Sequence, residues 1–127
     1  PWVPHVVPLH LVRVGPFAMT ALPFESTTVS GRRMRQTVEA ALPGVTHSVV
    51  STYANAYVGY LTTFEEYQVQ HYEAGYTLFG PHSLAAVRGE LEALAAQLGR
   101  SARSGDLPPR VDLSRLERTV FSGPWTA

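Results

Sequence analysis

The sequence contains no cysteine, no lysine and no long hydrophobic run. Without cysteine the chain can form neither a disulfide nor a thiolate metal site, although this does not decide the compartment, because secreted bacterial proteins often lack cysteine too. No apolar stretch approaches the roughly 20 residues that a membrane-spanning helix needs, and no signal-peptide pattern is visible. Ten arginines balance ten acidic residues. The zero net charge argues against a general nucleic-acid-binding protein, which is usually basic.

The composition is typical of one globular domain or of part of one. The chain has 127 residues, of which 45% are hydrophobic and 16% are charged, so a modest core can form and disorder is not predicted. The motifs GxSxG, HExxH, GxGxxG and the P-loop are all absent. The five histidines include no i, i+4 pair, so no local zinc-binding pair is predicted on a helix.

The first half of the chain predicts two strands, a helix and a third strand. Residues 8–14 alternate apolar and polar side chains, a glycine-proline turn follows, and residues 17–22 continue as a second strand of a hairpin. A cluster of serine and threonine side chains offers caps for a helix over about 27–42. Its buried stripe is predicted to be Met34, Val38, Ala41 and Leu42. Residues 47–53 are rich in β-formers and predict a buried strand.

The second half predicts a long structured loop and one clear helix. Residues 54–82 have no sustained period, although an acidic and aromatic run over 64–72 is compatible with a short helix. Ser83 is expected to cap a helix over about 84–98, and Gly99 stands at the expected C′ position. Leucine and valine at three- and four-residue spacing give this helix its apolar stripe. Together the elements predict an α/β fold, a mixed sheet with helices packed on its face.

Two places stand out as candidates for chemistry. Glu25 lies between a strand end and a helix N-terminus, where it can serve as a capping acid or, alternatively, as a metal ligand. All six tyrosines fall within a single stretch: Tyr53, Tyr57, Tyr60, Tyr67, Tyr72 and Tyr76. Each buried tyrosine hydroxyl needs a polar partner. The stretch therefore indicates either an aromatic core patch or the wall of a site.

Both places resemble the neutral ceramidases, also called neutral/alkaline non-lysosomal ceramidases. The segment LPFESTTVSGRRMR (22–35) is similar to their PGEFTT-SGRR-type motif. The segment ANAYVGYLTTFEEYQVQHYEAGYTLFGPHSL (54–84) is similar to their TYxxYxTT(Y/F)EEYQxQxYE…GPHTL-type motif. The order and spacing of the two motifs also match, and the resemblance spans about residues 8–99.

The resemblance implies a zinc-dependent amidase that hydrolyses the N-acyl bond of ceramide to sphingosine and a fatty acid. Glu25 matches the family's glutamate zinc ligand, and Tyr60 matches its tyrosine ligand. Tyr72 matches the tyrosine near the scissile carbonyl, where it would bind the substrate or the oxyanion. Such a donor set is coherent, since carboxylate and phenolate oxygens suit zinc beside two imidazoles. The other four tyrosines are expected to pack and to support the site.

The resemblance also implies what lies outside this chain. The matched segments correspond to the C-terminal part of a larger layered catalytic domain, so residues 1–99 are expected to form that portion and residues 100–127 a linker or tail toward an absent β-sandwich domain. Two histidine zinc ligands are expected from an earlier segment or partner chain. The lone chain is therefore expected to be inactive. Family members are secreted or at the cell surface, with possible peripheral membrane contact.

One departure from the family motif keeps other functions open. Phe24 stands where the family has glycine, and Ser26 stands where it has phenylalanine. A glycine allows backbone conformations that phenylalanine resists, so this difference raises the alternative that Glu25 is tilted away from the metal. The chain would then be a non-catalytic lipid-binding or interaction module on the same scaffold. A related amidase with another N-acyl substrate is the third alternative.

Overall fold

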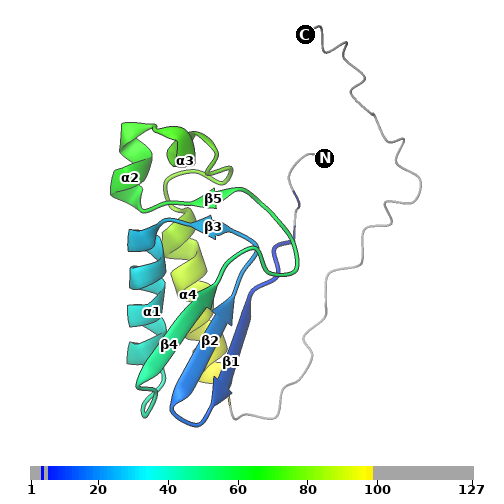
Figure 1. The fold of residues 1–127 in the computed structure, drawn as a ribbon, viewed down its shortest axis with the longest axis vertical. Helices are drawn as coiled ribbons and strands as arrows, with labels where there is room; N and C mark the ends of the chain where they lie inside the picture. Colours follow the sequence, from blue (N-terminus) through cyan, green and yellow to red (C-terminus); the bar gives the residue numbers. More distant parts are fainter. Residues whose placement is uncertain (1–3, 5, 99–127) are drawn as a thin grey trace, which may run out of the picture.

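The computed structural model describes residue 4 and residues 6–98. Its main sheet has three strands in the order β1-β2-β4 (Figure 1). Strands β1 (His10–Val14) and β2 (Phe17–Ala21) form an antiparallel hairpin, and β4 (His47–Ser51) pairs parallel to β2. The predicted hairpin, the third strand and the mixed character of the sheet are confirmed. The prediction that the third strand is buried was wrong, because His47, Val49 and Ser51 of β4 are exposed on the face opposite the helices.

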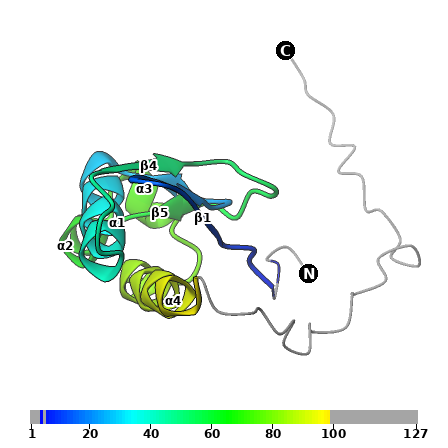
Figure 2. The same ribbon diagram turned by 90° about the horizontal axis from the view of Figure 1, so that it is seen from below.

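Two long helices cover one face of this sheet. Helix α1 (Thr28–Ala41) connects β2 to the parallel strand β4, as a crossover between parallel strands requires. Helix α4 (Ser83–Gln97) packs beside α1, and the view from below shows both helices on the same side of the strands (Figure 2). The side chain of Thr27 caps α1 by accepting a hydrogen bond from the Ser30 amide at 3.3 Å.

The core lies between the sheet and these helices. The predicted stripe of α1 is confirmed, because Met34, Val38 and Leu42 are buried and Ala41 packs against them. The stripe of α4 is confirmed at Leu84, Val87 and Leu91, which are also buried. Leu98, at the end of the predicted helix, is 37% exposed, since α4 ends before it. From the sheet, Ala18 and the residue Leu22 that follows β2 complete the core.

The prediction of one long loop over 54–82 was wrong in detail. This segment contains strand β5 (Tyr60–Leu61), helix α2 (Phe64–Val69) and helix α3 (Tyr72–Gly75). Each element is too short to produce a readable period, so pattern analysis missed two of the three. The predicted cap of α4 was also wrong, because Ser83 is the first helical residue and His82 is the N-cap.

The short strand β3 (Glu25–Ser26) follows β2 and pairs parallel to β5 as a separate two-stranded sheet. In Figure 1 this small sheet lies beyond the upper end of the main sheet, beside α2 and α3. The predicted Gly99 cap and the predicted linker 100–127 lie outside the described residues, so the proposed domain boundary stays a prediction.

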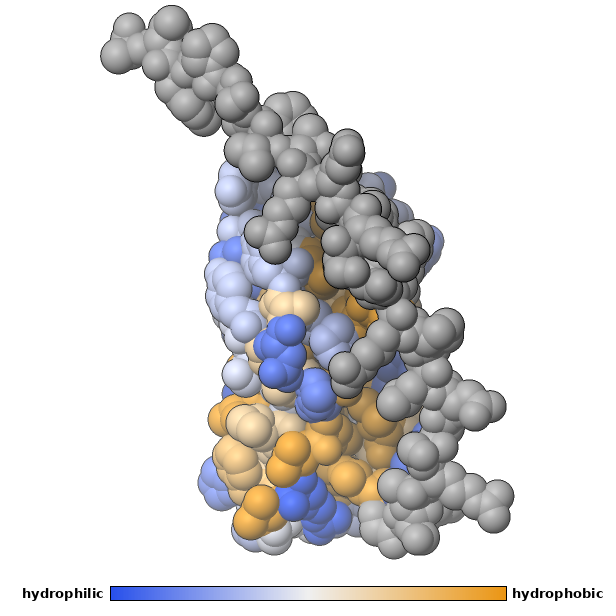
Figure 3. Space-filling model, turned by 90° about the vertical axis from the view of Figure 1, so that its right-hand side faces the viewer, coloured by the Kyte–Doolittle hydropathy of each residue, from blue (hydrophilic) through white to orange (hydrophobic). Residues whose placement is uncertain are grey.

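The face of the main sheet opposite the helices is apolar and open to solvent. Its exposed large hydrophobic residues are Val12, Val14, Phe17 and Val49, and we call these four the outer sheet face. The exposed polar residues His10, His47 and Ser51 lie on the same side of the sheet. The strand register sets Val12 opposite Met19 and Val14 opposite Phe17 on this face, and Val14 is 68% exposed. From the side of β1, hydrophobic side chains gather over the lower half of the molecule (Figure 3). Within the described part of the chain, every helix is too short or too polar to cross a bilayer.

Candidate functional site

The candidate site lies beyond the carboxyl ends of the parallel strands β2 and β4, where open α/β sheets bind their ligands. The two segments that leave these strands run side by side. The Tyr53 amide donates to the Phe24 carbonyl at 3.3 Å, and the Val58 amide donates to the Pro23 carbonyl at 3.0 Å. This pairing continues into β3 and β5, whose register sets Glu25 directly opposite Tyr60. Two of the three predicted site residues are therefore adjacent.

Glu25 is surrounded by phenol groups. The Tyr57 hydroxyl donates to Glu25 Oε2 at 3.2 Å. Hydrogen bonding from Tyr53 is the strongest influence on this carboxyl and lowers its pKa; partial burial opposes the shift, and bonds from Tyr60 and Tyr57 add to it. The carboxylate in turn raises the pKa of Tyr53 to about 12 and raises the pKa of Tyr60 as well. The group at this position is therefore an ionised carboxylate facing protonated phenols.

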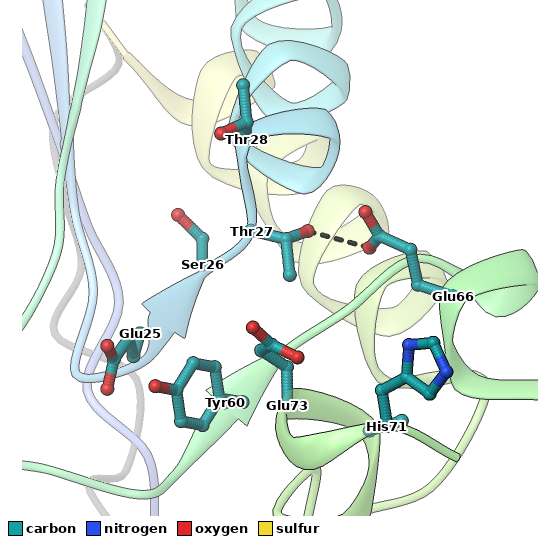
Figure 4. A pocket seen from close by; sticks show the side chains of 9 residues that line it. Glu25, Ser26, Thr27, Thr28, Tyr60, Glu66, His71 and Glu73 are labelled. Atoms are coloured by element: carbon teal, nitrogen blue, oxygen red, sulfur yellow. Dashed lines mark hydrogen bonds between the residues drawn. The ribbon is translucent and has the colours of Figure 1, made fainter. Parts of the chain in front are cut away.

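The alternative role of Glu25 as a helix-capping acid was wrong. Thr27 caps α1, and no acidic residue lies in the first turn of that helix. Figure 4 shows the Glu25 carboxylate turned toward the ring hydroxyl of Tyr60 and away from α1. The side chain is therefore free to act at the cavity.

Phe24 does not displace Glu25 from this arrangement. Phe24 is 3% exposed, and its ring packs edge-on against Phe79 with centroids 6.2 Å apart. Its backbone is not left-handed: among the described residues other than glycine, a positive φ occurs at Tyr53, Asn55 and Gln70. No conformation reserved for glycine is needed here, and the register of Glu25 with Tyr60 is kept.

Tyr72 lies against Tyr60 from the other side. Their rings meet edge to face with centroids 5.7 Å apart, and Tyr72 on α3 is 77% exposed. Tyr53 and Tyr57 stack in parallel, 5.8 Å between centroids. The interpretation of the tyrosine stretch as a buried aromatic core is wrong, because Tyr53, Tyr57 and Tyr76 are also largely exposed. Of the six tyrosines, Tyr60 lines the cavity beside Glu25, and Tyr72 and Tyr76 lie beside a second surface hollow.

A cavity of about 430 Å³ opens beside the small sheet. Its charged and aromatic lining comprises Glu25, Tyr60, Glu66, His71 and Glu73 (Figure 4). Residues 4 and 6–98 contain no group of three or more His, Cys, Asp or Glu side chains arranged for a metal ion. Because a zinc site commonly has four ligands, Glu25 and Tyr60 alone could not complete one.

Sequence reasoning missed the part that Glu66 plays in this site. Its side chain accepts hydrogen bonds from the Thr63 amide at 2.8 Å and from the Thr27 hydroxyl at 2.7 Å. The first bond completes a capping box at α2, for which the Thr-x-x-Glu spacing was a readable signal. The second bond joins residues 39 positions apart, so no local sequence pattern predicts it. Beside Glu66, Arg33 pairs with Glu65 and lowers the pKa of that carboxyl to about 2.

Gly59 permits the close approach that holds Tyr60. Its φ is +83°, and a Cβ added there would lie 2.5 Å from the Tyr76 carbonyl oxygen, which accepts the Tyr60 amide. We expect Gly59→Ala to lower the free energy of unfolding by about 1–3 kcal/mol, because the left-handed backbone and the contact are both unfavourable. Urea denaturation followed by circular dichroism measures this.

The matched control is Gly89→Ala within α4. No atom lies within 4 Å of a Cβ there, so alanine should raise stability by about 0.5–1 kcal/mol through helix propensity. Equal effects of the two substitutions would contradict the role given to Gly59.

The chain is similar in sequence to known neutral ceramidases. Residues 1–89 match the family described as neutral/alkaline non-lysosomal ceramidase, N-terminal. Neutral ceramidase A of Dictyostelium discoideum is 42% identical over 113 residues, which cover 85% of this chain and 16% of that protein. The neutral ceramidase of Pseudomonas aeruginosa is 46% identical over 88 residues, covering 68% of this chain and 13% of that protein.

The fold agrees with the sequence match. A crystal structure of neutral ceramidase from Pseudomonas aeruginosa superimposes with a TM-score of 0.82 at 39% identity, over 90% of this chain and 18% of the solved one. The chain thus spans about one sixth of the length of the curated relatives it matches. On the family match and these relatives together, this chain belongs to the neutral/alkaline non-lysosomal ceramidase family.

Proposed function

We propose that this chain supplies Glu25 and Tyr60 as zinc ligands, and Tyr72 as a substrate-binding catalytic group, to an amidase that hydrolyses the N-acyl bond of ceramide. The observation that carries the proposal is the cross-strand register of Glu25 with Tyr60 at the mouth of an acidic cavity. Further ligands and the remainder of the catalytic domain would come from sequence outside residues 1–127.

The residues fit a zinc ion by their chemistry. Glu25 offers an ionised carboxylate with Tyr60 directly opposite it, and carboxylate and phenolate oxygens are hard donors compatible with zinc. The carboxylate raises the pKa of Tyr60, so the charge of the zinc ion would have to favour ionisation of this phenol. A zinc ion bound there would supply a water of lowered pKa and polarise the amide carbonyl. The Tyr57 hydroxyl, which donates to Glu25 Oε2 at 3.2 Å, helps to hold the carboxylate in place.

Tyr72 has the position and the freedom to meet a substrate. Its ring is fixed against Tyr60, while most of its surface faces solvent. A phenol hydroxyl next to the reacting carbonyl would donate a hydrogen bond to the oxygen as negative charge develops on it. The edge-to-face contact orients the hydroxyl without burying it, which leaves it available to a ligand.

The open surfaces favour a completing chain. Strand β1 pairs on one side only among the described residues, so its outer edge has unpaired backbone groups. The outer sheet face adds contiguous apolar surface of the kind that marks an interface. A preceding segment of the catalytic domain, on the same polypeptide or on a partner, would cover both. A secreted or cell-surface location, as the family implies, belongs to this proposal.

Complementation tests the proposal. The chain is produced alone and together with the part of the Pseudomonas aeruginosa neutral ceramidase that precedes its matching segment. We expect ceramide hydrolysis and zinc, measured by fatty acid release and by metal analysis, from the pair and from neither part alone. A panel of N-acyl lipids with other bases tests the substrate class.

Three outcomes would overturn the proposal. Hydrolysis by the lone chain would contradict the need for a partner. A complex that binds ceramide vesicles without zinc would favour the non-catalytic module. Faster hydrolysis of another N-acyl lipid than of ceramide would favour the related amidase.

A further inference from the structure

The small sheet that carries Glu25 and Tyr60 is held by very few backbone contacts. Strands β3 and β5 are two residues long each. The Glu25 amide donates to the Gly59 carbonyl at 3.0 Å, and the Thr27 amide donates to the Leu61 carbonyl at 3.1 Å. An isolated two-stranded pair of this length is not stable in water, so its register needs support from outside the ladder.

Glu66 provides a connection at the open end of this ladder. One oxygen, Oε2, accepts both from the Thr63 amide and from the Thr27 hydroxyl. Thr27 directly follows β3 and caps α1, whereas Thr63 lies two residues after the end of β5 and caps α2. A single carboxylate therefore ties together the two chain segments just where each leaves the small sheet, as the dashed bond in Figure 4 indicates.

The direction of the hydrogen bond between Thr27 and Glu66 follows from the single proton of the Thr27 hydroxyl. The Thr27 hydroxyl has one proton, and its contact with the Glu66 carboxylate at 2.7 Å is shorter than its contact with the Ser30 hydroxyl at 3.0 Å. Charge-assisted bonds are the stronger ones, so Thr27 donates to Glu66 and accepts from the Ser30 amide. Each bond of the bridge then has one donor and one acceptor, and removing Glu66 leaves two donors without this partner.

We infer that Glu66 is a positioning residue, which clamps the caps of α1 and α2 together and thereby keeps Glu25 opposite Tyr60. The clamp itself rests only on the contacts above, while its value for metal binding rests on the proposed function. Because both bonds go to one oxygen, the amide oxygen of glutamine can replace it, but alanine cannot. The connection, and not the negative charge, is what the site requires of this residue.

Amide hydrogen exchange of the full chain, followed by NMR, tests the clamp without zinc. Glu66→Ala should speed exchange of the Thr27 amide about tenfold or more, because without the bond from the Thr27 hydroxyl to the carboxylate the Thr27 amide separates more readily from the Leu61 carbonyl. The amides of β2 should stay within about twofold of the wild type. Glu66→Gln should stay close to the wild type. The control Thr63→Ala removes the other bond of the α2 capping box but leaves the link to Thr27, so it should fray α2 alone.

Each outcome of these experiments either supports or contradicts the role of Glu66 as a clamp. An unchanged Thr27 amide in Glu66→Ala would overturn the clamp, and so would a uniform loss of protection, which indicates a general stabilising role. Equal effects of Glu66→Gln and Glu66→Ala would assign the role to charge instead. In the complemented complex, Glu66→Ala should weaken zinc affinity about tenfold and Glu66→Gln should not. If the wild-type complex binds no zinc, the proposed function fails, while the exchange result still decides the clamp.

Discussion

Glu25→Gln in the complemented complex is expected to abolish zinc retention and ceramide hydrolysis together. The substitution keeps the shape of the side chain but removes the anionic oxygen that the surrounding phenols hold. Loss of a group that only orients a metal ligand typically weakens affinity 10–100-fold, so loss of the ligand itself should exceed ~100-fold. Isothermal titration with Zn²⁺ and turnover of ceramide in the same samples measure both effects.

The control for this prediction is Glu92→Gln, the same change at an exposed position on α4. It should leave zinc content, turnover and melting temperature unchanged. A Glu25→Gln complex that retains zinc and turns over at the wild-type rate would remove Glu25 from the site. A lower melting temperature without loss of metal would assign Glu25 a structural role instead.

Tyr72→Phe is expected to lower kcat about 10²–10³-fold, the usual cost of removing one donor to a developing oxyanion. Phenylalanine keeps the edge-to-face contact with Tyr60, so zinc content should not change and KM should change little. Tyr60→Phe should behave differently and lose the metal, because it removes a ligand oxygen. Steady-state kinetics with metal analysis separate these two tyrosines.

Tyr67→Phe on α2 serves as the matched control for the tyrosines, since Tyr67 neither lines the cavity beside Glu25 nor belongs to the ring contact between Tyr60 and Tyr72. It should retain both zinc and turnover. If Tyr72→Phe changed KM and left kcat intact, Tyr72 would bind substrate equally in the ground and transition states and would not act on the reacting carbonyl.

The main sheet and the two long helices could be predicted from the sequence because each has a period long enough to read. The four-residue spacing of Met34, Val38 and Leu42 reflects burial of one face of α1. The alternation in β1 was also readable, although only Leu11 of its five residues is partly buried. The ends of the elements were less predictable. Ser83 has the chemistry of a cap, yet its hydroxyl donates to the Gly80 carbonyl at 2.6 Å inside the turn that precedes α4.

The site was predictable only where a family motif names its residues. Glu25 and Tyr60 are 35 positions apart in the sequence. They are adjacent because β3 pairs with β5, and these two-residue strands are too short to give a periodic pattern in the sequence. The bond between Thr27 and Glu66 is likewise a tertiary contact. The loop that brings Tyr53 to Glu25 has two left-handed residues, Tyr53 and Asn55. Only asparagine is a residue type that favours this conformation, so the turn at Tyr53 had no sequence signal.

The lack of cysteine, together with the shape of the main sheet, gives the molecule a convenient reporter position. Strand β2 has five residues, so the hairpin turn and the cavity are separated by about 17 Å of strand. A thiol introduced at the exposed Val14, beside that turn, would be the only one in the chain. A fluorophore attached there would follow docking of a completing chain by its change in emission, while the tyrosines at the opposite end remain unlabelled.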